Sequence, residues 1–121
     1  MLDPNYVLLY VVDPPASAAF YAPLLGRPPV ENSPTFVLFV LASGVKLGLW
    51  LLPDVKPAAA HTGGGCELAF TVADETAVRG THAEWTRMGL TIAQTPAQMD
   101  FGFTFTALDP DGHRLRVFSP G

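Results

Sequence analysis

Tyr6-Val-Leu-Leu-Tyr-Val-Val-Asp13 and Glu67-Leu-Ala-Phe-Thr-Val-Ala-Asp74 are two copies of one pattern, and together they decide the fold. Each is an apolar run with β-branched and aromatic residues, which predicts a buried strand. Each closes on an aspartate that can cap a following helix. We expect these helices over residues 16–25 and 75–88, because a glycine follows each segment and suits the end of a helix.

The repeat continues to the end of each half. Gly44-Val-Lys-Leu-Gly-Leu-Trp50 aligns with Gly112-His-Arg-Leu-Arg-Val-Phe118, and each is preceded by a turn signal and another apolar segment. In the second half we expect a short strand over residues 90–93 and a loop over 94–100. Both halves therefore predict the order strand–helix–strand–strand–strand.

The organisation that follows is α+β: two βαβββ modules that form a cupped mixed sheet. Residues 54–65 hold prolines, alanines and three consecutive glycines without periodicity, which is typical of a linker. We expect module one over residues 1–53 and module two over 66–121. The two modules form a single domain, 1–121, because the chain has the length of one domain.

Composition excludes several classes of protein. With 49% hydrophobic and 15% charged residues, the chain is too apolar to be disordered, and part of its surface is expected to be covered by a second copy. A net charge of −4 without a basic cluster argues against a nucleic-acid partner. The apolar run over 36–42 is too short to span a bilayer, so we expect no membrane partner and a cytoplasmic location.

Several motifs support a family resemblance over essentially the whole chain. They are Val12-Asp13 followed by Ser17-Ala-Ala-Phe-Tyr21, then Leu24-Leu-Gly26, and Leu108-Asp-Pro-Asp-Gly-His113 before the last strand. In register with the repeat, they resemble the vicinal oxygen chelate superfamily, which includes glyoxalase I, extradiol dioxygenases, and the bleomycin and fosfomycin resistance proteins. Leu47-Gly-Leu-Trp50 and Met99-Asp-Phe-Gly102 further resemble a metal-free branch that binds phenazine-type antibiotics.

The resemblance implies where a divalent metal would be held in the enzymes of this superfamily. The matching positions here are Tyr6, Gly48, Glu67 and Arg116. Glycine has no donor atom and a guanidinium has no lone pair, so only Glu67 is an ordinary ligand. We therefore expect no metal and no other cofactor, with Glu67 and Arg116 paired in the metal's place.

No catalytic template is visible in the sequence, and we assign no catalytic residue. The single cysteine, Cys66, has no histidine partner that the sequence can place. The glycines at 63–65 are not followed by the Lys-Ser/Thr pair of a phosphate-binding loop. The three histidines lack ligand-type neighbours and are interpreted as surface or capping side chains.

Alternation along the strands predicts which side chains face away from the helices. On that face Trp50 lies beside Gly48, whose missing side chain would leave open space for a flat aromatic ligand. The orientation of strand 101–108 stays open, because one register step reverses every side chain. The candidate ligand-binding residues are Tyr6, Tyr10, Phe39, Gly48, Trp50, Glu67, Met99, Phe103, Arg114 and Arg116.

The favoured function is metal-free binding of a planar aromatic natural product, of phenazine or quinoxaline type, by a homodimer whose clefts are shared between chains. The resemblance supplies this ligand class, and resistance to or carriage of the compound would follow from binding alone. Two alternatives stay open: a glyoxalase-type lyase or dioxygenase with atypical ligands, and a non-catalytic dimeric scaffold that binds nothing specific.

Overall fold

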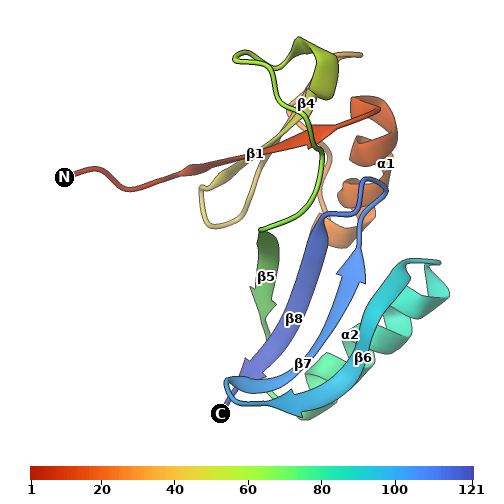
Figure 1. Ribbon diagram of the computed structural model, residues 1–121. Coiled ribbons are helices and arrows are strands. Elements are labelled where there is room, and N and C mark those ends of the chain that lie inside the picture. Colours follow the sequence, from red (N-terminus) through yellow and green to blue (C-terminus); the bar gives the residue numbers. More distant parts are fainter. The chain divides into compact units, whose positions relative to one another are not determined.

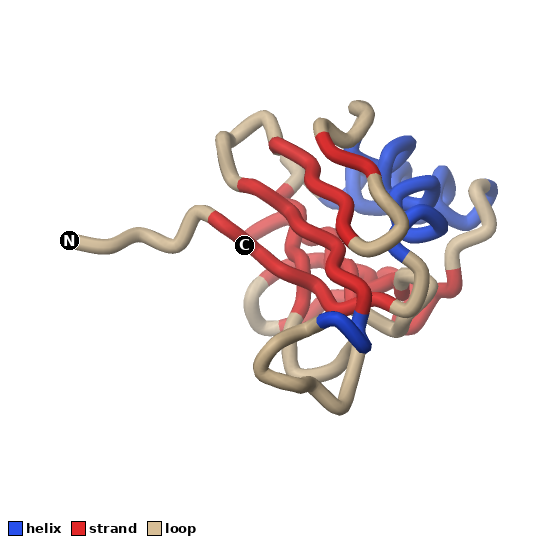
Figure 2. Tube along the Cα trace, turned by 90° about the horizontal axis from the view of Figure 1, so that it is seen from above, coloured by secondary structure: helices blue, strands red, loops and turns tan.

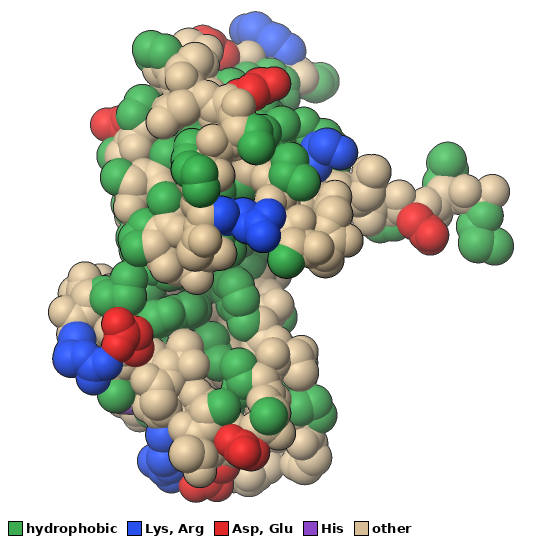
Figure 3. All heavy atoms as spheres, turned by 180° about the vertical axis from the view of Figure 1, so that it is seen from behind, with side chains coloured by type: hydrophobic (Ala, Val, Ile, Leu, Met, Phe, Trp, Pro, Cys, Tyr) green, Lys and Arg blue, Asp and Glu red, His purple; other side chains and the backbone are tan.

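The computed structural model describes residues 1–121 and divides them into two compact units, Met1–Gly63 and Gly64–Gly121. The boundary lies inside the segment that the sequence assigns to the linker. Neither helix is long and apolar enough to cross a membrane. On the face drawn in Figure 3, charged side chains are scattered among uncharged ones, without an extended basic patch.

Unit 1 builds one four-stranded mixed sheet with a helix on one side (Figures 1 and 2). Its elements are β1 (Tyr6–Val11), α1 (Pro14–Leu25), β2 (Glu31–Asn32), β3 (Phe36–Val40), β4 (Lys46–Leu51) and the short 3₁₀ helix η1 (Leu52–Asp54). The strand order is β1-β4-β3-β2, with β1 parallel to β4 and the other pairs antiparallel. The residues before β1 extend away from the sheet as a tail (Figure 2).

Unit 2 repeats this plan, with α2 across one side of its sheet (Figure 1). Its elements are β5 (Glu67–Thr71), α2 (Glu75–Arg87), β6 (Thr91–Met99), β7 (Gly102–Leu108) and β8 (Arg114–Pro120). The order β5-β8-β7-β6 places β8 parallel to β5 and antiparallel to β7, as in the first unit. The predicted α+β class and the repeated βαβββ modules are confirmed, as two four-stranded sheets.

The capping aspartates begin both helices as expected. The Asp13 carboxylate accepts a hydrogen bond from the Ala16 backbone N–H at 3.2 Å, and Asp74 accepts one from Ala77 at 2.8 Å. Each bond satisfies a backbone donor that the first helical turn would otherwise leave unpaired. Gly26 ends α1 with φ 67°, a left-handed conformation that favours glycine.

Alternation divides each sheet into two faces, which we call the helix face and the open face. The helix faces hold the cores: Val11, Val37, Phe39, Leu47 and Leu49 in unit 1, and Phe105, Leu115 and Val117 in unit 2, are at most 1% exposed. Trp85 of α2 contacts Phe70 and Phe105 edge-to-face and is 7% exposed, so it belongs to the core. Burial of each such side chain contributes on the order of 1.5–3 kcal/mol.

The sequence-based boundaries differ from the structure mainly in two places, and α2 ends at Arg87, one residue before the expected end. Helix α1 begins at Pro14, two residues before the expected start, because proline fits the first turn, where its missing N–H is not needed. The short strand 90–93 and loop 94–100 are wrong, because one long strand, β6, spans both segments. Register shifts between Ile92 and Gln94 and between Gln94 and Ala97 accommodate its irregularity, including Pro96.

Candidate functional site

An apolar hollow lies on the open face of unit 1. Tyr6, Leu8, Phe36 and Trp50 line its volume of about 450 Å³. Strand pairing aligns Tyr10 with Trp50 and Trp50 with Phe36, which brings β1, β4 and β3 together at this point. Tyr6 and Leu8 are each 45% exposed, an unusual position for large apolar side chains. Such a surface favours an apolar ligand or partner.

Trp50 is held in place by an aromatic neighbour. Its ring meets Tyr10 edge-to-face, with centroids 6.3 Å apart, so that the indole stands as one wall of the hollow. Lys46 lies at the start of the same strand, with its Nζ 5.8 Å from the centroid of the Tyr6 ring. The hollow therefore combines aromatic walls with a cation beside Tyr6.

The expected open space at Gly48 is not there. A Cβ at this position would lie 2.6 Å from Cδ2 of Leu8 and 2.9 Å from Cζ of Phe36. The ends of Leu8 and Phe36 already occupy the space that the absent side chain leaves. Leu8 pairs with Gly48 on one side, and Phe36 lies on the other neighbouring strand, two residues from Leu38, which pairs with Gly48 there. Gly48 therefore contributes to the hollow indirectly, by letting Leu8 and Phe36 approach the sheet.

The open face of unit 2 is polar, and its centre is an ion pair. Arg116 donates from Nε to Oε1 of Glu67 at 2.7 Å and from Nη2 to Oε2 at 2.9 Å. Two parallel charge-assisted hydrogen bonds of this kind fix both side chains. The expected pairing of Glu67 with Arg116 is confirmed. We call this two-residue arrangement the guanidinium clamp.

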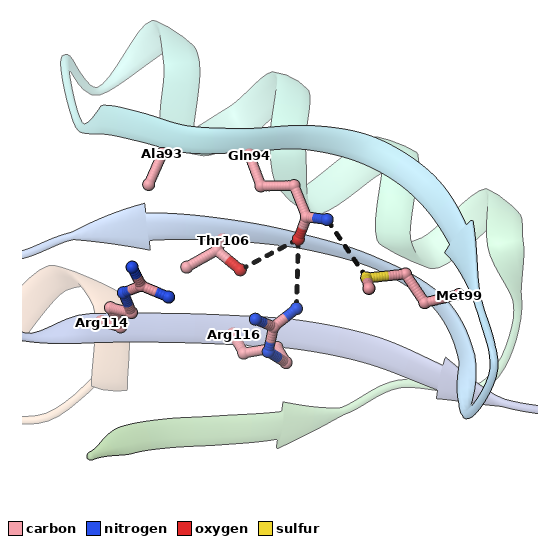
Figure 4. A pocket seen from close by; sticks show the side chains of 6 residues that line it. All are labelled: Ala93, Gln94, Met99, Thr106, Arg114 and Arg116. Carbon is pink, nitrogen blue, oxygen red and sulfur yellow. Dashed lines mark hydrogen bonds between the residues drawn. The ribbon is translucent and has the colours of Figure 1, made fainter. Parts of the chain in front are cut away.

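Neutral side chains extend the clamp, and among them Gln94, Thr104 and Thr106 were not sequence candidates. Arg116 Nη1 donates to Oε1 of Gln94 at 3.1 Å (Figure 4). It also donates to Oγ1 of Thr104 at 3.3 Å. The same Gln94 oxygen accepts a hydrogen bond from Thr106 at 3.3 Å, and its amide nitrogen donates to Sδ of Met99 at 3.2 Å. Arg116 is consequently satisfied on several sides, and its side chain is only 17% exposed.

The clamp shifts the acidity of both partners. Hydrogen bonding from Arg116 holds the pKa of the Glu67 carboxyl below its usual range, although partial burial opposes the change. The same bond raises the pKa of the Arg116 guanidinium. Glu67 is therefore a carboxylate at neutral pH, and it is already occupied by a cation.

With this geometry established, comparison with known proteins identifies the family. The model of the Glyoxalase/Bleomycin resistance protein/Dioxygenase superfamily matches residues 4–117. The chain belongs to this superfamily. It is also 27% identical to the phenazine antibiotic resistance protein EhpR of Enterobacter agglomerans over 119 residues, covering 96% of this chain and 91% of that protein.

Solved structures of the superfamily and its neighbours agree with the fold. A protein from Agrobacterium tumefaciens with a solution NMR structure is 55% identical, with a TM-score of 0.92, and the match covers 100% of this chain and 99% of that one. A glyoxalase-related enzyme from Fulvimarina pelagi has a TM-score of 0.84 at 24% identity, over 98% of this chain and 88% of that one. The second likeness shows the shared fold alone.

The metal of the superfamily's enzymes does not fit the residues at the matching positions. Tyr6 and Gly48 supply no ordinary ligand, Arg116 is a cation, and both oxygens of Glu67 accept hydrogen bonds from that cation. Elsewhere in residues 1–121, no three His, Cys, Asp or Glu side chains gather into a group that could hold a metal. The donor set thus departs from that of the superfamily's metalloenzymes.

The structure separates the sequence candidates into three groups. Tyr6 and Trp50 line the apolar hollow, and Tyr10 adjoins it. Glu67, Met99, Arg114 and Arg116 lie on the open face of unit 2, and Met99, Arg114 and Arg116 line a hollow there with Ala93, Gln94 and Thr106 (Figure 4). Phe39 and Phe103 lie on the helix faces and do not reach either hollow.

The prediction that Phe39 and Phe103 bind a ligand is wrong, because both side chains are buried on the helix faces. Phe39 aligns with Leu47 and has no exposed surface. Phe103 is 8% exposed, and the guanidinium of Arg79 from α2 lies 4.7 Å from its ring. Leu8, Phe36 and Gln94 take part in the open faces instead, although none was among the sequence candidates.

Proposed function

We propose that this member of the superfamily binds a planar aromatic natural product, of phenazine or quinoxaline type, and releases it unchanged. The observation that carries the proposal is the apolar hollow, which the part-buried Trp50 and the exposed Tyr6 line together with Leu8 and Phe36. A flat ring placed against these walls would gain both burial and aromatic contact. The similarity to a phenazine antibiotic resistance protein supports the ligand class.

The expected affinity for the ligand depends on how many aromatic side chains line the hollow. Each aromatic contact contributes about 0.5–1.5 kcal/mol beyond area burial, whereas micromolar binding requires about 8 kcal/mol. Most of the free energy must therefore come from burying the ligand's apolar surface. The exposed Leu8 and Tyr6 supply apolar area for this purpose.

Release of the ligand unchanged rests on the chemistry of the residues present. Glu67 is engaged by Arg116, so it is a poor general base at neutral pH. Cys66 is exposed and makes only a 4.0 Å contact with the backbone oxygen of its neighbour Glu67, without a base beside it. Nothing in this arrangement favours a lyase or dioxygenase reaction over binding.

The proposal includes a homodimer. Each four-stranded sheet ends in two edge strands, β1 and β2 in unit 1 and β5 and β6 in unit 2. Unpaired backbone groups on such edges favour association with another sheet, and two-fold symmetry is the common solution. Sedimentation at micromolar concentration should give a dimer mass, and a monomer would contradict this part of the proposal.

Calorimetric titration with phenazine and with quinoxaline tests the binding. Trp50→Ala should weaken binding about fivefold to tenfold, the loss expected for one aromatic wall. Phe20→Ala is the matched control, because Phe20 is a part-buried aromatic of α1 that packs edge-to-face on Tyr21, away from the hollow. Equal affinity of the wild type and Trp50→Ala would remove the hollow from the binding site.

Two further readouts complete the test. In a Trp85→Phe background, Trp50 is the remaining tryptophan, and its emission should be quenched as the ligand binds. The ligand recovered afterwards should have an unchanged mass. A changed mass would show that the chain is an enzyme of the lyase or dioxygenase kind.

A further inference from the structure

One cation lies at the edge of the apolar hollow of unit 1. Lys46 pairs with Tyr6 in the register of β4 and β1, and its Nζ lies 5.8 Å from the centroid of the Tyr6 ring. Because side chains alternate along a strand, Lys46 and Trp50 project from the same open face of β4. Tyr6 and Trp50 both line the hollow, so the ammonium group lies at one end of it and the indole at the other.

The ammonium group of Lys46 has no carboxylate of its own. Lys46 is part-buried, yet it forms no ion pair in the structure. Glu31 is the other charged residue on the strands of unit 1, and it lies exposed two strands away on β2. Arg116, the part-buried cation on the open face of unit 2, is by contrast bound by Glu67. A cation beside apolar side chains attracts an anion more strongly than one in open water, because it is less screened.

The position of Lys46 also limits where on a ligand the anion can be. Lys46 precedes Trp50 by four residues, which is about 13 Å along an extended strand. Leu8 lies between them on the neighbouring strand, opposite Gly48, and offers apolar surface to a ring. A flat ring system that rests on Trp50 therefore reaches the ammonium group only with a substituent at its far end.

We propose that the planar ligand carries an acidic group at one end, ionised at neutral pH, and that Lys46 binds this group. An ammonium is a compact point charge with three donors, so it accepts a carboxylate without requiring one fixed orientation. Trp50 and Lys46 then recognise different ends of one molecule. The inference rests on the proposed function, because it assigns the charge of the ligand that the hollow of unit 1 binds.

The test compares phenazine-2-carboxylate, whose charge lies at the end of the three-ring system, with its neutral amide, by calorimetry on the full chain at neutral pH. The wild type should bind the carboxylate about three to five times more tightly than the amide at low salt, and the preference should shrink at high salt. Lys46→Gln should bring the ratio of the two affinities close to one, while its affinity for the amide stays near that of the wild type. Lys46→Arg should keep the preference, because it keeps the charge.

Lys56→Gln is the matched control, because Lys56 is the chain's other lysine, is exposed and does not line the hollow. It should leave the ratio as in the wild type. Equal affinity of the wild type for the two compounds, an unchanged ratio in Lys46→Gln, or an equal fall of the ratio in Lys56→Gln would overturn the inference while the proposed function stands. Failure of the wild type to bind either compound would overturn both.

Discussion

The two units share one chain path, yet their open faces have opposite chemistry. In unit 1 the open face displays Tyr6, Leu8 and Trp50, whereas in unit 2 it displays Arg114 and the guanidinium clamp. The helix faces, by contrast, are alike: both are apolar and almost fully buried. The fold constrains the face that packs on its helix and leaves the other face free to differ, and the function proposed here uses that second face.

The difference has an energetic side. Large apolar side chains on an exposed surface gain free energy when something covers them. A part-buried guanidinium is tolerated only with a partner, which Glu67 supplies. A ligand or partner that covered the open face of unit 1 would therefore bind favourably. On the open face of unit 2, by contrast, Glu67 and Arg116 already pair with each other.

The largest effect should come from the helix face. Trp85→Ala removes a core indole that contacts Phe70 and Phe105, and should lower the free energy of unfolding by about 3–5 kcal/mol. Trp50→Ala removes the same side chain from the open face, and should cost about 1 kcal/mol because Trp50 is only part-buried. Urea unfolding followed by circular dichroism measures both, and equal losses would break the distinction between the faces.

A smaller loss of stability is expected when one residue of the guanidinium clamp is replaced. Glu67→Gln leaves Arg116 without its carboxylate, and should lower stability by about 1–2 kcal/mol. Glu84→Gln breaks an exposed pair with Arg87 on α2, and should cost at most about 0.5 kcal/mol. If the two glutamine variants unfold at the same urea concentration, the clamp contributes no more than a surface pair.

The contribution of the clamp should depend on pH. Because Arg116 lowers the folded-state pKa of Glu67, the folded chain binds a proton there less readily than the unfolded chain. The stabilisation is thus complete above the ordinary carboxyl range and is lost as the pH falls through the folded value. The difference in unfolding free energy between the wild type and Glu67→Gln should be largest near about pH 7 and shrink below about pH 4. A difference that is constant or grows in acid would contradict this assignment.

The smallest effect should come from the glycine below the hollow. Gly48→Ala would displace the ends of Leu8 and Phe36 and should lower stability by less than about 1 kcal/mol, because both side chains lie at the surface and can rotate. Gly80→Ala, in α2 with open space at its Cβ, should raise stability by about 0.5–1 kcal/mol. Melting temperatures of the two variants should move in opposite directions, and a rise for Gly48→Ala as well would mean that Gly48 has no packing role.

Much of the fold could be predicted from the sequence because the decisive signals are local. Asp13 and Asp74 indicate where the two helices begin, because an aspartate side chain accepts a hydrogen bond from the first helical turn. Gly26 indicates where α1 ends. Strand β8 alternates clearly enough to assign its two faces, with Arg114 and Arg116 on one side and Leu115 and Val117 on the other. The pairing of Glu67 with Arg116 was predicted from the family resemblance, which places both residues at matching metal-ligand positions, and the structure confirms it.

The rest depended on packing that no local pattern reveals. Strand β3 is apolar throughout, so nothing in its sequence distinguishes the side of Phe39 from that of Phe36. Strand β7 alternates phenylalanine and threonine, but Thr104 and Thr106 are buried beneath Arg116 and Gln94, so exposure does not mark the faces. Gln94 was not predicted as a site residue, because Pro96 and the surrounding polar residues are typical of a loop rather than of a strand.

The most direct test of the account follows methyl resonances during titration with phenazine. Leu8 lies at the hollow and is 45% exposed, whereas Leu47 lies on the helix face of the neighbouring strand and is 1% exposed. A ring bound against Trp50 should shift the Leu8 methyl signals strongly by its ring current and leave those of Leu47 nearly in place. Shifts confined to Leu47 and its core neighbours, or unchanged Leu8 signals at saturating ligand, would contradict the assignment of binding to the open face of unit 1.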